Sequence, residues 1–193
     1  MVSLTTLLIE ALVLAVVALA LAAALGGRPG FRRFFATFED LLAGAFLVAG
    51  LSVVLISVFM RYVLNNPPGW ADEFARIFVA WGAMFGFSVA LREGRHITVD
   101  LLFSVLPPAG KRALDLLASL IGVFFASFIA AAGYHYVAFL KMLGLKSIYT
   151  ELPEWLLQLI LPLGFGLFAF QFALNFWDLF TGRAQVHEEV SGV

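Results

Sequence analysis

Long apolar runs constrain this chain more than any other feature, because a helix that crosses a bilayer needs about 20 mostly apolar residues. Four segments meet or approach that length: Leu41–Met60, Ile77–Leu91, Ala113–Leu140 and Trp155–Trp177. The second segment is short, and it reaches spanning length only if its helix begins near Trp70. The sequence therefore predicts an all-α integral membrane protein with a four-helix transmembrane domain at residues 38–180.

A further apolar run, Leu4–Leu25, contains only Thr5, Thr6 and Glu10 as polar residues. We expect an extra transmembrane helix in a separate N-terminal segment, residues 1–30. A cleaved signal peptide is the alternative, since "LAAALGG" has the small residues of a cleavage region. No Lys or Arg precedes Ile9, however, and a signal peptide normally begins with a basic leader.

Composition excludes several classes of function. Apolar residues make up 62% of the chain, whereas about half is typical of soluble domains. A formal net charge of −1 gives no basic field for nucleic acid, and the absence of cysteine removes thiol catalysis and thiolate metal sites. The spans hold few ionisable groups for an ion pathway, and no glycine-rich phosphate loop with a lysine is present. We therefore expect no enzyme activity, cofactor or metal.

Basic residues predict the orientation, because Lys and Arg in short loops mark the cytoplasmic side. If the five segments alternate, one side receives Arg28, Arg32, Arg33, Arg92, Arg95, Lys111, Arg112 and Arg183. The other side receives Arg61, Arg76, Lys141 and Lys146. The bias places the C-terminus and a tail at residues 181–193 in the cytoplasm, and the N-terminus outside.

Charge is concentrated in "RYVLNNPPGWADEFARIFVAW", residues 61–81, which belongs to the outer face. Pro67, Pro68 and Gly69 predict a turn between two helices. The candidate site residues of this cluster are Arg61, Trp70, Asp72, Glu73 and Arg76. Trp70 suits the membrane boundary, and both carboxylates lie within helical reach of Arg76. Two compatible interpretations follow: an ionic latch that fixes the hairpin, in which Arg61 and Arg76 pair with Asp72 and Glu73, or a docking patch for a partner.

Small residues predict where helices pack closely. Gly82 and Gly86 form a glycine pair, and a second stripe recurs every four residues at Ala118, Gly122, Ala126 and Ala130. Such residues let helix backbones approach inside lipid. Pro162 predicts a kink in the last span.

The stretch 93–108 is too short to span, and it carries a narrow polar stripe of Glu93, His96, Asp100 and Ser104. This pattern predicts a short helix lying at the cytoplasmic interface. His96 and His135 fall near opposite membrane faces, which disfavours a haem held by both.

The ordered motifs resemble the small membrane subunit of tripartite ATP-independent periplasmic (TRAP) transporters. The resemblance lies in Arg61-Tyr62, Asn65, Trp70, Glu73, Arg76, Gly86, Arg92, Gly94, His96-Ile97, Val99-Asp100, Pro153, Trp155, Pro162 and Gly164. It implies a four-helix subunit of the bacterial inner membrane, surrounded by lipids, with residues 1–30 outside the family pattern.

The resemblance also implies a function and partners. Such a subunit braces a large membrane transport subunit, which carries the substrate and sodium sites, and helps to form the docking surface for a periplasmic substrate-binding protein. The imported solute is an organic acid. The alternatives that stay open are a homo-oligomeric channel or scaffold and a haem-binding membrane protein.

Overall fold

The structure, a computed structural model, describes residues 3–92 and 108–182. Its elements are α1 (Leu4–Leu25), α2 (Pro29–Tyr62), α3 (Gly69–Arg92), α5 (Pro108–Leu143), α6 (Glu154–Leu157) and α7 (Ile160–Thr181). Within these two ranges, five long helices are apolar enough to cross a membrane, which confirms the predicted all-α membrane fold. The predicted interfacial helix lies outside the described residues, apart from Pro108, which begins α5.

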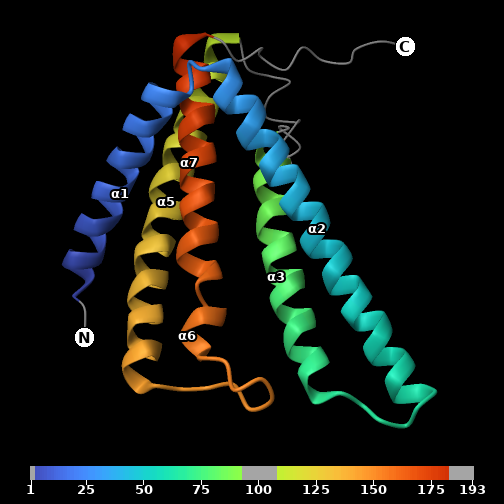
Figure 1. Ribbon diagram of the computed structural model, residues 1–193. Helices are drawn as coiled ribbons and strands as arrows, with labels where there is room; N and C mark the ends of the chain where they lie inside the picture. The colour runs from blue at the N-terminus through green and yellow to red at the C-terminus, as the bar shows by residue number, and fades with distance from the viewer. Residues whose placement is uncertain (1–2, 93–107, 183–193) are drawn as a thin grey trace, which may run out of the picture.

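The long helices run alternately up and down in two groups (Figure 1). Helices α1, α5 and α7 pack together, while α2 and α3 form a hairpin that contacts this group through α3 and α7. The two groups diverge toward the end that carries the α2–α3 turn (Figure 1). We call this the outer end, and the opposite end, where α7 finishes, the inner end.

Helix α2 is longer than its apolar run predicts, because it begins at Pro29 and not near Leu41. Proline is favoured at the first helical position, where its missing N–H needs no partner. The helix stops at Tyr62, before Pro67, and the chain turns through Asn65 with φ of 51°. Asparagine tolerates this left-handed conformation, which allows the turn to form before the prolines are reached.

Helix α3 begins at Gly69, so the short third segment does acquire spanning length by starting beside Trp70, as predicted. The last span is divided into α6 and α7 around Gln158 and Leu159. Pro162 explains the position of this break. Its ring disturbs the carbonyl four residues earlier, that of Gln158, so the interruption lies one turn before the proline itself.

The small residues singled out from the sequence differ in their surroundings. A Cβ at Gly82 would meet Leu47 Cγ at 2.9 Å, whereas a Cβ at Gly86 would meet nothing within 4 Å. On α5, the Phe172 ring of α7 lies against Gly122. Ala126 and Ala130 are buried, while Ala118 is exposed in this chain.

Helix α1 joins the bundle through an alanine stripe that the sequence analysis did not single out. Ala11, Ala15, Ala18 and Ala22 are its buried residues. Three of them belong to a core cluster with Val123, Ala126, Ala169, Ala173 and Leu174 of α5 and α7. Their short side chains let α1 approach both helices at once.

We expect Gly82→Leu to lower the free energy of unfolding in detergent by about 1 to 3 kcal/mol, because the new side chain overpacks the α2–α3 contact. Thermal unfolding followed by circular dichroism measures the change. Gly86→Leu is the matched control on the same helix, where the site is open. Equal midpoints for both variants would contradict the close contact at Gly82.

Candidate functional site

The outer charged cluster forms one exposed ion pair and one helix hydrogen bond. Arg61 Nη2 of α2 lies 3.5 Å from Asp72 Oδ2 of α3, and their side chains are 49% and 67% exposed. Arg76 Nε donates to the main-chain carbonyl of Asp72 at 3.3 Å. Exposed ion pairs of this kind contribute roughly 0 to 1 kcal/mol, so the cluster adds little to the stability of the α2–α3 hairpin.

Glu73 does not join the ion pairs that the sequence predicted for it. Its residue is 4% exposed, and its Oε2 has no hydrogen-bond partner. Consecutive positions on a helix differ by about 100° in direction. Asp72 and Arg76 therefore share the exposed face, while Glu73 turns into the bundle, away from both arginines.

Aromatic residues mark the outer membrane boundary near this cluster. Trp70 is 43% exposed and packs edge-to-face on Phe74, with ring centroids 6.0 Å apart. On the other helix group, the Lys141 ammonium lies 5.3 Å from the centroid of Trp155. Tryptophan and lysine both favour the level of the lipid headgroups, so these contacts place the two groups at a common height.

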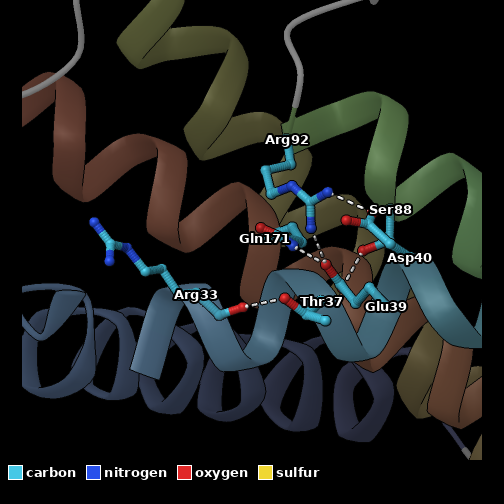
Figure 2. A network of polar contacts seen from close by, with 7 residues as sticks. All are labelled: Arg33, Thr37, Glu39, Asp40, Ser88, Arg92 and Gln171. Atoms are coloured by element: carbon cyan, nitrogen blue, oxygen red, sulfur yellow. Dashed lines mark hydrogen bonds and ion pairs between the residues drawn. The ribbon is translucent and has the colours of Figure 1, made fainter. Parts of the chain in front are cut away.

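A buried polar network lies at the inner end of the bundle (Figure 2). Glu39 of α2 is fully buried, and its Oε1 accepts a 2.6 Å hydrogen bond from Ser88 Oγ of α3. Its Oε2 accepts a 2.6 Å bond from Gln171 Nε2 of α7. A single carboxylate thus joins three helices.

Arg92, at the end of α3, supplies the positive charge for this network. Its Nη1 lies 3.4 Å from Glu39 Oε2, and its Nη2 lies 2.6 Å from Asp40 Oδ1. Figure 2 shows its guanidinium beside the two acidic residues of α2. A buried carboxylate is costly unless it is paired and hydrogen-bonded, and here both oxygens of Glu39 have partners.

Two further contacts fasten the inner end of α7. Arg32 Nη2 of α2 lies 2.5 Å from Asp178 Oδ2. Arg112 of α5 donates from Nη2 to the Leu179 carbonyl at 2.7 Å and to the Phe180 carbonyl at 3.3 Å. A cation on the last carbonyls complements the negative end of the helix dipole.

The sequence analysis missed this network, although signals for it were present. Glu39 and Asp40 directly precede an apolar run, and Gln171 interrupts the last one. Polar residues at such positions nearly always find partners within the bundle. Arg92 was noted as a marker of orientation and as part of the family motif, but its partners could not be assigned without knowing which helices are neighbours.

A second polar contact lies between α1 and α5. Glu10 Oε2 and His135 Nε2 are 2.6 Å apart, and their side chains are 44% and 27% exposed. The sequence analysis placed His135 near one membrane face, and in the structure its ring packs on Tyr134. Among the described residues, no group of three or more His, Asp or Glu side chains is placed to hold a metal ion.

The helices and motifs described above can be compared with those of known protein families. The profile of the DctQ component of the tripartite ATP-independent periplasmic transporters matches residues 50–182, more than half of the chain. The chain belongs to this family. The resemblance read from the motifs is therefore confirmed, and this DctQ-family protein is a multi-pass membrane component of a transporter. Helix α1 precedes the matched region.

Individual relatives agree with the family match. The C4-dicarboxylate TRAP transporter small permease protein DctQ of Rhodobacter capsulatus is 34% identical over 127 residues, or 64% of this chain and 56% of that protein. The ectoine TRAP transporter small permease protein TeaB of Halomonas elongata is 27% identical over 161 residues, 81% of this chain and 83% of TeaB.

A third relative is much longer than this chain. The isethionate TRAP transporter permease protein DctMQ of Oleidesulfovibrio alaskensis is 30% identical over 159 residues, which is 75% of this chain and 24% of DctMQ. The chain thus spans a little over half of the Rhodobacter protein and about a quarter of DctMQ.

We expect Arg92→Met to lower the free energy of unfolding by about 1 to 3 kcal/mol, because it leaves Glu39 and Asp40 without their cation. Methionine retains the apolar stem, so packing changes little. Denaturation in detergent measures the loss, with Arg76→Met as the exposed control. Adding Glu39→Gln to Arg92→Met should restore part of the stability. If the double variant is as unstable as the sum of the single ones, the two residues are not coupled.

We expect Glu73→Gln to raise the free energy of unfolding by about 1 kcal/mol, since an amide is easier to bury than an unpartnered carboxylate. Asp72→Asn is the neighbouring control, and it should lower stability slightly by removing the pair with Arg61. The comparison uses thermal midpoints of the two variants in the same detergent. A lower midpoint for Glu73→Gln would show that its carboxylate is paired after all.

Proposed function

We propose that this chain is the accessory subunit of a binding-protein-dependent, sodium-coupled secondary transporter that imports an organic acid. It braces the large transport subunit and helps to form the docking surface for the periplasmic binding protein. One observation carries the bracing role: at the inner end, Arg92 pairs with Glu39 and Asp40, and Arg32 pairs with Asp178, in each case across two helices. These charges fix helices in place and are not arranged as a path through the bilayer.

Relatives support the class of solute. Their names refer to C4-dicarboxylate, ectoine and isethionate, which are small organic solutes. We therefore propose an organic acid for the present system, recognised by the partner subunits. The chain itself catalyses no reaction in this proposal.

The relative DctMQ supports a large membrane partner. Its name is that of a whole permease, and the part similar to this chain is 24% of its length. We propose that the separate partner here packs along α2. This span is 17% buried within the chain, compared with 39% for α5, and it exposes large apolar residues such as Leu51 and Leu55. Helix α1, by contrast, covers α5 and α7 from the other side.

The distribution of basic residues supports the orientation. Among the described residues, six cations lie at the inner end of the helices: Arg28, Arg32, Arg33, Arg92, Lys111 and Arg112. Four lie at the outer end: Arg61, Arg76, Lys141 and Lys146. We propose that the inner end faces the cytoplasm of a bacterial inner membrane, with the C-terminus on that side.

A tagged chain with a photoreactive amino acid at position 51 tests both the function and the surface. Purification in mild detergent should recover the large transport subunit, and irradiation should cross-link it. The same amino acid at position 12 of α1 is the control, because Leu12 is similarly exposed but lies on the other side of the bundle. Cross-linking from position 12 alone would overturn the proposed α2 surface.

Transport measurements test whether this chain moves solute by itself or only together with the large subunit and the binding protein. Liposomes that contain this chain alone should not accumulate solute when a sodium gradient is applied. Liposomes with both membrane subunits and the binding protein should do so. Sodium-driven uptake by the chain alone, or stable purification with no large partner, would contradict the accessory function.

A further inference from the structure

An apolar groove of about 590 Å³ lies between α1, α5 and α7. Its walls include Val13 and Val17 of α1, Ala130 of α5, and Gly166 and Phe170 of α7. Small residues leave this space, because a Cβ at Gly166 would meet nothing within 4 Å. An open apolar groove inside a bilayer is filled by something apolar, since empty space forfeits van der Waals contacts.

The groove has the dimensions of a lipid chain. It runs along α1 from Ile9 to Leu21, which is about 18 Å at the helical rise per residue. One leaflet of the hydrocarbon core is about 15 Å thick. A single extended acyl chain therefore matches the groove in length and in apolar character.

The outer part of the groove is polar. Glu10 lines it and contacts His135 at 2.6 Å, and Glu10 keeps 44% of its side chain exposed. Glu10 lies at a depth that suits the base of a headgroup. Its partner His135 is about 9 Å along α5 from Lys141, which lies over Trp155 at the membrane boundary. No Lys or Arg is found among the described residues that line the groove.

We propose that this groove binds one phospholipid with an ammonium-bearing headgroup, such as ethanolamine. One acyl chain lies between α1, α5 and α7, and the ammonium group lies near Glu10. Charge complementarity selects this occupant. Beside its contact with His135, the Glu10 carboxylate stays 44% exposed and attracts an ammonium group. An anionic lipid with a glycerol headgroup would meet the same carboxylate, and no Lys or Arg lines the groove there.

This lipid site is independent of the function proposed above. It depends on α1, which precedes the region matched by the family, and neither transport nor partner binding is its readout. Its consequence is local: the bound chain fills the space between α1 and α7 and adds contacts that hold α1 to the bundle.

Native mass spectrometry of the protein purified with its co-purifying subunits tests the site. The wild-type chain should retain one ethanolamine phospholipid. Gly166→Leu fills the groove without a clash and should reduce this occupancy about tenfold, which corresponds to about 1.4 kcal/mol. Gly86→Leu is the control, because Gly86 is an equally open glycine on α3, away from the groove. No retained lipid, or equal occupancy in both variants, would overturn the proposal.

The headgroup preference has a separate test. Exchange against equal amounts of ethanolamine and glycerol phospholipids should favour ethanolamine in the wild-type chain. Glu10→Gln should abolish that preference while retaining a lipid. An unchanged preference would remove Glu10 from headgroup recognition.

A third test uses the unaltered protein, so its result does not depend on whether a variant folds. An ethanolamine phospholipid with a photoreactive group in its acyl chain should label peptides from residues 9–21 and 127–134. Labelling confined to the outward face of α2 would show that bulk lipid, and not the groove, is the source of the bound molecules.

Discussion

The burial of Glu39 is the interaction on which the arrangement of this protein depends. A carboxylate enclosed at the end of a membrane bundle must receive hydrogen bonds from its own helices, because lipid offers none. Ser88, Gln171 and Arg92 provide them, and they come from α3 and α7. The same contacts that satisfy the carboxylate therefore decide which helices are neighbours. Directional contacts join the α2–α3 hairpin to the α1–α5–α7 group at this point and at the Arg32–Asp178 ion pair, and elsewhere the two groups meet mainly by shape.

Close packing without large side chains completes this arrangement. Glycine and alanine at Gly82, Gly122, Ala126 and the α1 stripe bring the helices near enough for continuous contact. In lipid there is little hydrophobic gain when two helices meet, so the gain must come from fit and from hydrogen bonds. The polar network sets the identity of the neighbours, and the small residues set their distance. The polar network and the small-residue contacts both form between residues of this chain alone.

Much of the fold is predictable because its signals are local. Spanning length depends on runs of residues, which is why the five helices and the start of α3 beside Trp70 were anticipated. The family was also readable, since its motifs are ordered along the sequence. The site was less predictable. Glu73 was assigned to an ion pair because its spacing from Arg76 allows one, but spacing gives no information on which face of α3 is buried. The Glu39 network and the Glu10–His135 contact join residues distant in sequence, so they required knowledge of helix neighbours.

The position of Glu39 has a consequence for the membrane itself. The network lies immediately before Leu41, and the uncharged stretch that follows, to Met60, is about 30 Å long as a helix, close to the thickness of the hydrocarbon core. A thicker bilayer would draw Arg92 and Asp40 toward the acyl chains, and a thinner one would expose apolar side chains near Arg61 to water. Both changes cost free energy through hydrophobic mismatch. The uncharged stretch of α2 thus matches a hydrocarbon core about 30 Å thick. It also sets the depth in the membrane at which a neighbouring protein contacts α2.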